Sequence, residues 1–484
     1  MEQRLKHNAI SAMIWTAFGK FGMLSIQLAA NMCLARLLMP ADFGAVGMLT
    51  IFMAVSEVFI TAGFGQALIQ KKKIAPIDCT TVFYWNLFAS GIIYLVLFFC
   101  APMIAAFYNM PILSSVLRVQ SLSLIISSFS IVQNNLLQKN LQFKALYVRT
   151  LIATVLGTSS AIILAIKGYG IWSLVFSSLV SSFANSLLLW FRSSWKPTLA
   201  FSVQSFRELF SFGSLMAMSS IVDQLYQEIQ GLIIGKMYSA TDMGYYAQAR
   251  KLNSVPTSSL SQIVSQVSFP VFSKLQNDKD NLRNAVRKTA KSVTYLNFPL
   301  MMLLVVIAPP LIHLLYGDKW DASIPYFRIL CVSGMFYTIL TTNNSVVKSL
   351  GKSALFLKIR LIQRGLGIAF MCFGAVYSIK GILYGLVIGN CFNYLIVSWY
   401  TSKLIDYSLW NQMKDIGNSF ATSIIAALIA CFAGEYAKCN QYLIMFLQVL
   451  IYVVCYIGTT ALLKNDAFYI YRNIILKKIG KNDG

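Results

Sequence analysis

Apolar runs of about 20 residues, repeated along the whole chain, constrain this sequence more than any other feature, because a run of that length crosses a bilayer as an α-helix. Fourteen such runs fit into the 484 residues and leave only short connections and a tail. The chain is therefore predicted to be an all-α polytopic membrane protein. The expected spans are 11–34, 44–69, 81–107, 113–136, 145–167, 169–191, 207–237, 244–269, 289–315, 323–348, 356–378, 381–403, 417–437 and 441–463.

The composition leads to the same prediction. Hydrophobic residues make up 57% of the chain and charged residues 12%, whereas a soluble domain carries about 25% charged residues. The net charge of +23 would suggest a nucleic-acid partner in a soluble protein. Here the positive residues lie between apolar spans, so the positive-inside rule explains most of them and no nucleic acid is expected.

Lysine and arginine are distributed unevenly between alternate connections. The set that includes both chain ends holds 29 of them, against 7 in the opposite set. Because cytoplasmic loops carry the excess of positive residues, both termini are expected in the cytoplasm, as an even number of spans requires. The residues of the smaller, outer set are Arg36, Arg118, Lys167, Lys236, Lys319, Lys380 and Lys438.

A weak internal repeat relates two sets of six spans. At an offset of 200, Asp42 aligns with Asp242 and Gly44 with Gly244, where the first span of each set joins the second. Both copies then face the same way, which implies a two-fold axis along the membrane normal. A turn pattern common to membrane helices is the alternative. The expected domains are six-helix bundles at 1–200 and 201–403, then two additional helices and a basic cytoplasmic tail at 404–484.

The sequence lacks the motifs of classical enzyme chemistry. Its two histidines, His7 and His313, cannot form an H-E-x-x-H zinc site, and neither a Walker phosphate loop nor a G-x-S-x-G elbow occurs. The nine cysteines are scattered without a C-x-x-C pair, which is typical of small packing residues. We therefore expect no enzyme activity, no cofactor and no metal site.

Polar side chains inside the spans are the candidate site. An ionisable side chain at a helix centre costs about 2.5–3.5 kcal/mol, so it normally faces a cavity or a partner. Lys20 lies in the middle of the first span, with Gln27 and Asn31 on the same side of the helix. Arg250 in the eighth span and Arg364 in the eleventh are further candidates. For Arg364, a role as cytoplasmic anchor is an equal alternative.

Acidic candidates lie in the second and seventh spans. Glu57 is near the middle of the second span. The seventh span, the repeat mate of the first, places Asp223, Gln224, Gln227 and Glu228 on one face. Intramembrane acids normally mark a functional site, but buried ion pairs that hold helices together are the alternative.

Residues 35–87 contain three recognisable segments, A-R-L-L-M-P-A-D-F-G, T-A-G-F-G-Q-A-L-I-Q-K-K and D-C-T-T-V-F-Y-W-N-L. A fourth, G-Y-Y-A-Q-A-R-K-L, lies at 244–252. They resemble the polysaccharide transporter branch of the multidrug/oligosaccharidyl-lipid/polysaccharide exporter superfamily. Within it, the Wzx-type oligosaccharide flippases that export colanic and teichuronic acid are the most similar. The resemblance implies two six-helix bundles around a central cavity in the bacterial inner membrane. It also implies export of undecaprenyl-pyrophosphate-linked repeat units by alternating access, for lipopolysaccharide, capsule or exopolysaccharide synthesis.

Roles for the candidate residues follow under this hypothesis. Lys20 and Arg250 would hold the phosphates, amide and hydroxyl side chains would bind sugar, and Glu57, Asp223 or Glu228 would bind H⁺ or Na⁺. Expected partners are the lipid-linked oligosaccharide and membrane lipids, with a polysaccharide polymerase and glycosyltransferases nearby. A cation-coupled multidrug exporter and a peptidoglycan-precursor lipid flippase of the same superfamily are the alternatives. A membrane glycosyltransferase is disfavoured because every loop is short.

Overall fold

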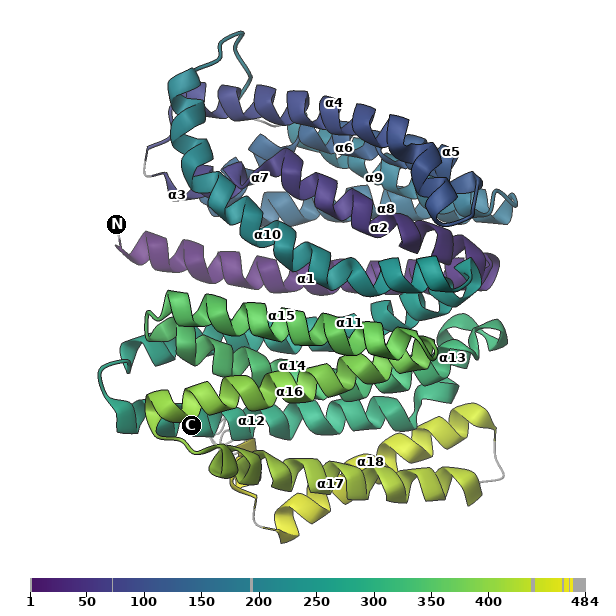
Figure 1. The fold of residues 1–484 in the computed structure, drawn as a ribbon, viewed down its shortest axis with the longest axis vertical. Helices are drawn as coiled ribbons and strands as arrows, with labels where there is room; N and C mark the ends of the chain where they lie inside the picture. The colour runs from purple at the N-terminus through teal and green to yellow at the C-terminus, as the bar shows by residue number, and fades with distance from the viewer. Residues whose placement is uncertain are drawn as a thin grey trace. The chain divides into compact units, whose positions relative to one another are not determined.

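The computed structural model describes residues 2–71, 73–191, 195–436, 440–463, 465–469 and 471–472, and within these ranges it contains helices and connections but no strand (Figure 1). Cys439 and the tail residues Lys477, Lys478 and Lys481 lie outside the described residues. The chain forms two compact units, Met1–Ala247 (unit 1) and Gln248–Gly484 (unit 2).

Unit 1 contains the first ten helices and the start of the eleventh. Their bounds are α1 Glu2–Leu37, α2 Pro40–Thr61, α3 Phe64–Gln70, α4 Pro76–Phe107, α5 Ile112–Gln120, α6 Leu122–Ser128, α7 Ile131–Lys139, α8 Phe143–Ile166, α9 Ile171–Trp190, α10 Val203–Met237 and α11 Ala240–Lys274.

Unit 2 begins inside α11 and contains the remaining helices. Their bounds are α12 Lys279–Val306, α13 Ala308–Tyr316, α14 Ser323–Ser349, α15 Ser353–Ala375, α16 Ile379–Ile405, α17 Leu409–Tyr436 and α18 Gln441–Leu462, with a short 3₁₀ turn at Asp318–Trp320 between α13 and α14.

The predicted all-α polytopic fold is confirmed, and each of the fourteen expected spans falls on one long helix or on consecutive helices. Among the described residues, nine helices are long and apolar enough to cross a membrane, and the bent α5–α7 run makes up to ten. The other long helices, α1, α10, α11 and α15, are the ones that carry the polar faces singled out above. Those polar residues lower their hydropathy.

Three expected spans are not single helices. The span at 44–69 breaks at Ala62 and Gly63, which both have positive φ, into α2 and α3. The span at 289–315 breaks before the two prolines that open α13. The span at 113–136 is interrupted twice, and its two parts on either side of Phe129 are bent by 44°.

At the bend between α6 and α7, side chains of α9 donate hydrogen bonds to backbone carbonyl groups. The indole Nε1 of Trp190 donates to the Phe129 carbonyl at 3.0 Å, and the Ser186 hydroxyl donates to the Ile126 carbonyl at 2.7 Å. A helix interrupted at membrane depth needs such partners, because lipid offers none. Neighbouring side chains therefore make the break tolerable.

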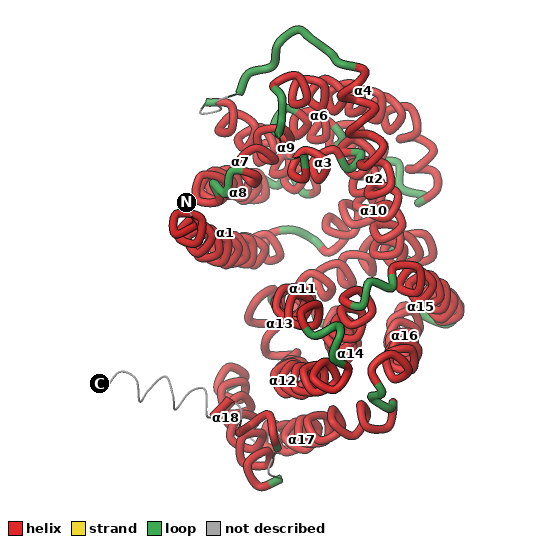
Figure 2. The backbone as a smooth tube through the Cα atoms, turned by 90° about the vertical axis from the view of Figure 1, so that its left-hand side faces the viewer, coloured by secondary structure: helices red, strands yellow, loops and turns green. Residues whose placement is uncertain are grey.

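Small residues allow close helix packing in unit 1, where α8 packs on both α1 and α9, and α2 packs on α10 (Figure 2). A Cβ atom added to Gly157 of α8 would lie 2.7 Å from the Ser181 Cβ of α9. Interfaces between membrane helices are rich in such residues, since association there depends on close van der Waals contact.

Unit 2 is built around α12, α14 and α16, with α15 packed on α16 and the α17–α18 pair packed on α12. Its core is partly polar. The buried amide of Asn297 donates to the Met335 carbonyl at 3.0 Å and to the Thr338 hydroxyl at 2.8 Å. Asn343 donates to the Ser398 hydroxyl at 2.9 Å. These hydrogen bonds link α12 to α14 and α14 to α16.

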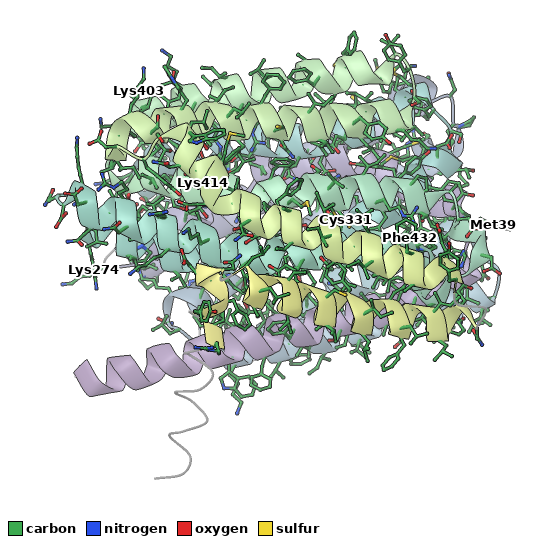
Figure 3. All side chains as sticks on the ribbon, turned by 90° about the horizontal axis from the view of Figure 1, so that it is seen from below. Met39, Lys274, Cys331, Lys403, Lys414 and Phe432 are labelled. Atoms are coloured by element: carbon green, nitrogen blue, oxygen red, sulfur yellow. The ribbon has the colours of Figure 1, made fainter. Side chains whose placement is uncertain are left out.

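An ionic cluster joins α17 to α12. The Asp415 carboxylate, whose side chain is 5% exposed, accepts two hydrogen bonds from Arg287, at 2.7 and 2.9 Å, and lies 3.1 Å from Lys291 Nζ. The Tyr407 hydroxyl also donates to it at 2.7 Å. Lys274, Lys403 and Lys414 gather toward the same end of unit 2 (Figure 3). One end of this unit is therefore strongly basic.

Candidate functional site

The pairing of α2 with α10 sets the geometry of the acidic candidates in unit 1. A Cβ atom added to Gly235 would lie 2.9 Å from Met48 Cγ, and one added to Gly213 would lie 2.6 Å from the Ala62 carbonyl oxygen. Residue numbers rise along α2 while they fall along α10, so the helices are antiparallel. The two contacts lie toward opposite ends of the helix pair.

Glu57 on α2 and Asp223 on α10 both lie between these two contacts in sequence. The Glu57 side chain is exposed and that of Asp223 is half-buried, whereas Glu228, five residues further along α10, is only 9% exposed. The amides also differ, because Gln224 is half-buried and Gln227 is exposed. The structure thus brings the three predicted acids onto one antiparallel helix pair.

The three residues of the polar stripe predicted on α1 differ in their exposure. Lys20 and Gln27 are exposed, but Asn31 is 4% exposed. The helix packs on α8, where Gly19 is buried against the Tyr147 ring. Periodicity alone placed the three residues on one side of the helix, but it could not show where packing begins.

The two arginine candidates belong to unit 2, and both are half-buried. Arg250 lies one turn before Asn253, whose amide donates to Cys331 Sγ at 3.5 Å. Arg364 follows the buried Gln363, whose amide donates to the Asn393 carbonyl at 3.2 Å. Each arginine is therefore next to a side chain that ties its helix to a neighbour.

A charged cluster at one end of unit 1 was not predicted as a site. Lys71 Nζ lies 2.9 Å from the Glu208 carboxylate and 3.2 Å from that of Asp78, which is 1% exposed. The hydrogen bond to Glu208 raises the pKa of Lys71 above its usual value, so the lysine stays protonated at neutral pH. Lys139 donates to the Leu68 carbonyl at 3.1 Å. The run of lysines at 71–73 suggested only the positive-inside rule, and the acids that meet it come from other helices.

The repeat predicted from Asp42 and Asp242 has matching local structure. Asp42 accepts a hydrogen bond from the Met39 backbone N–H at 3.0 Å, and Asp242 accepts one from the Ser239 backbone N–H at 3.3 Å. A carboxylate three residues into a helix caps its free N–H groups. Both acids therefore start a helix in the same way, one at α2 and one at α11.

No metal centre is found in the described part of the chain, where no group of three or more His, Cys, Asp or Glu side chains could hold an ion. The intramembrane polar residues come from α1, α2, α10, α11 and α15.

A family described as "Polysaccharide biosynthesis protein" matches residues 33–325, more than half of the chain. The chain belongs to this family. The prediction from residues 35–87 is thereby confirmed, and the match includes α2 and α10 with their three acids. The family's members are transporters, which is the class expected from the sequence.

Two relatives span most of the chain. Teichuronic acid biosynthesis protein TuaB of Bacillus subtilis (strain 168) is 24% identical over 423 residues, which cover 86% of this chain and 87% of that protein. Succinoglycan biosynthesis transport protein ExoT of Rhizobium meliloti (strain 1021) is 26% identical over 423 residues, which cover 87% of this chain and 86% of that protein. The similarity is thus not confined to one bundle.

The fold is similar to that of a solved flippase. The structure of "Lipid II flippase MurJ, inward closed conformation" matches with a TM-score of 0.76 at 16% identity, covering 96% of this chain and 100% of that one. At this identity the likeness shows the fold. The predicted all-α fold agrees with it.

Proposed function

We propose that the chain is a flippase that moves undecaprenyl-pyrophosphate-linked oligosaccharide repeat units from the cytoplasmic to the outer leaflet. The family match over residues 33–325 carries this proposal. The names of the relatives, one of them a transport protein for succinoglycan, and the fold of a lipid flippase support it. The product would serve synthesis of a surface polysaccharide, such as lipopolysaccharide O-antigen, capsule or exopolysaccharide.

The physical task is to move a headgroup that hydrocarbon rejects. Sugars and a pyrophosphate cannot enter lipid without hydrogen-bonding and charged partners. Lys20 and Arg250 hold the phosphates in this proposal, and Arg364 adds a third positive charge. Gln27, Gln224 and Gln227 bind sugar hydroxyls, whereas Asn31, also predicted for this role, is buried in this structure. The lipid tail stays in the bilayer throughout.

Transport proceeds by alternating access between two six-helix bundles, at 1–200 and 201–403, with 404–484 as an addition outside them. An inside-negative potential favours outward movement of an anion by about 2.3 kcal/mol per charge for each 100 mV. Two uncompensated phosphate charges would therefore gain about 4.6 kcal/mol. Protein charges that move together with the substrate reduce this gain.

Localisation and partners follow from the same proposal. The protein resides in the bacterial inner membrane with both termini in the cytoplasm, as the 29 to 7 distribution of Lys and Arg predicts. It catalyses no covalent step itself, and a polymerase and glycosyltransferases use or supply its substrate. A multidrug exporter and a peptidoglycan-precursor flippase remain the alternatives.

Analysis of lipids from a deletion strain tests the proposed function. We expect undecaprenyl-linked repeat units to accumulate and surface polysaccharide to disappear, because synthesis continues inside while export stops. Normal surface polysaccharide with increased drug sensitivity would contradict the proposal and favour the multidrug exporter. Arrested peptidoglycan synthesis with accumulated peptidoglycan precursor would favour the third candidate.

Neutralising the acids of the α2–α10 pair tests ion coupling. With Glu57→Gln, Asp223→Asn and Glu228→Gln combined, we expect transport to fall at least about tenfold and to lose its dependence on H⁺ or Na⁺, since a carboxylate is the usual intramembrane ligand of a coupling cation. The measurement is lipid-linked oligosaccharide flipping in proteoliposomes at varied pH and Na⁺.

Glu208→Gln is the matched control for this triple variant. Glu208 lies on the same helix, but its side chain is 60% exposed at the helix end. Its neutralisation should leave ion dependence unchanged. Unaltered transport and ion dependence in the triple variant would exclude these acids as the coupling site.

A further inference from the structure

The first turns of α2 and α11 touch through their backbones. A Cβ atom added to Gly44 would overlap the Ala240 carbonyl oxygen and lie 2.9 Å from the Gly244 nitrogen. One added to Gly244 would overlap the Pro40 carbonyl oxygen and lie 3.2 Å from the Pro40 Cα. Both glycines are buried. Glycine at both positions is therefore what permits this approach.

The two glycines occupy equivalent positions of the repeat, 200 residues apart. Asp42 and Asp242, which cap the two helix starts, each lie two residues before the glycine of their helix. Each glycine therefore meets the backbone that begins the other helix. Such a contact is self-complementary, as between copies related by a two-fold axis.

The chemistry of this crossing suits a contact that separates and re-forms. The glycines contribute backbone surface only. At the same end of α10, Lys236 donates to the Phe107 carbonyl, but this hydrogen bond is exposed, so parting the crossing leaves no buried charge without a partner. At the other end of α10, by contrast, a charged pair joins Lys71 to Glu208. Opening at the glycine crossing therefore requires no separation of such an ion pair.

The crossing lies beyond the candidate site along both helices. Glu57 is 13 residues further along α2 than Gly44, and Arg250 is six residues further along α11 than Gly244. At 1.5 Å per residue, these separations are about 20 Å and about 9 Å. Arg36 and Lys236, just before the two helix starts, belong to the set of positive residues predicted to lie outside.

We infer that the Gly44–Gly244 crossing is the outer closure of the transport path. The two repeats touch here while the candidate site is shut off from the outside, and they part when it opens outward. Gly44 and Gly244 determine how closely the path can close. This inference rests on the proposed function and on the predicted orientation.

Distance measurements across the crossing test the closure. Met39 and Met237 flank it and are 66% and 53% exposed, so spin labels there should not disturb packing. The labels are placed on a cysteine-free chain that retains transport, in liposomes with undecaprenyl-pyrophosphate-linked oligosaccharides extracted from a deletion strain. We expect two distance populations whose ratio changes with the substrate. One unchanged distance in a transporting protein would overturn the inference.

Alanine substitutions at Gly44 and Gly244 test whether these two residues determine how closely the path closes. Gly44→Ala and Gly244→Ala should each shift the population to the longer distance and lower transport at least about tenfold, because the methyl group has no room. Gly91→Ala in α4 is the control, since nothing lies within 4 Å of its added Cβ. Normal distances and normal transport in both crossing variants would overturn the inference.

The two proposals can fail separately. If the distance changes during turnover but the protein moves another lipid or a drug instead of the oligosaccharide, the closure stands and the proposed substrate is wrong. If oligosaccharide moves while the distance stays fixed in the unsubstituted protein, the proposed function stands and the closure is wrong. The distance measurement on the unsubstituted protein also decides the case if an alanine variant does not fold.

Discussion

Gly63→Ala is expected to lower the free energy of unfolding by about 3 kcal/mol, because it combines a strained backbone with an overlap between helices. Gly63 has a φ of +72° in the turn between α2 and α3, a conformation that costs a side chain about 1–2 kcal/mol. Its Cβ would also overlap the backbone of Gly213 in α10. The substitution therefore opens the helix pair that carries Glu57 and Asp223.

Substitutions at two further glycines separate the effect of backbone strain from that of the overlap between helices. Gly168 has a φ of +80° but nothing within 4 Å of its added Cβ, so Gly168→Ala should cost only about 1 kcal/mol. Gly91 has neither feature, and Gly91→Ala should be neutral or stabilise by up to about 1 kcal/mol. Unfolding midpoints of the three variants in the same detergent give the order. A Gly63→Ala protein as stable as the Gly168→Ala protein would contradict the close packing of α2 and α10.

Asp415→Asn is expected to lower the free energy of unfolding by about 3 kcal/mol, because it removes the buried charge that accepts hydrogen bonds from the exposed Arg287, the partly buried Lys291 and the Tyr407 hydroxyl. The amide keeps the shape of the carboxylate but cannot accept both hydrogen bonds from Arg287 together with those of Lys291 and Tyr407. Burial and the hydrogen bond to Asp415 raise the pKa of Tyr407 above its usual value. The hydroxyl therefore remains a donor at neutral pH and needs its acceptor.

Asp466→Asn is the matched control for Asp415. The Asp466 carboxylate also pairs with Lys291, at 2.6 Å, but its side chain is 68% exposed. An exposed pair contributes less than about 1 kcal/mol, so the same substitution should change the thermal midpoint little. Equal losses in the two variants would show that burial of Asp415 does not determine the strength of this cluster.

The sequence predicted the helices better than their interruptions. Each expected span falls on helix because lipid demands a continuous hydrogen-bonded backbone, although polar residues leave α1, α10, α11 and α15 less apolar than the other long helices. The break at Gly63 and the one before the prolines of α13 had local signals, which a hydropathy window averages away. The bend after Ser128 had no sufficient local signal in the sequence. It is stabilised by Ser186 and Trp190 of another helix, which donate hydrogen bonds to the carbonyl groups at the bend.

The candidate site was predictable by residue type and only partly by position. Intramembrane charge singled out Glu57, Asp223 and Glu228, and packing then placed them on one helix pair. Asn31 shows the limit of periodicity, because a stripe on one side of a helix can run from an exposed surface into a packed one. The Lys71 cluster could not be foreseen, since its acids are distant in sequence and meet only in the fold.

Flipping by the purified protein tests the central claim most directly. Unsubstituted protein is reconstituted into liposomes with undecaprenyl-pyrophosphate-linked oligosaccharide, and a sugar-specific enzyme outside reports the lipid that reaches the outer leaflet. We predict that the exposed fraction rises with time only when protein is present, and faster when the potential drives the anion outward. An exposed fraction that matches protein-free liposomes at every potential and ion gradient would contradict the account.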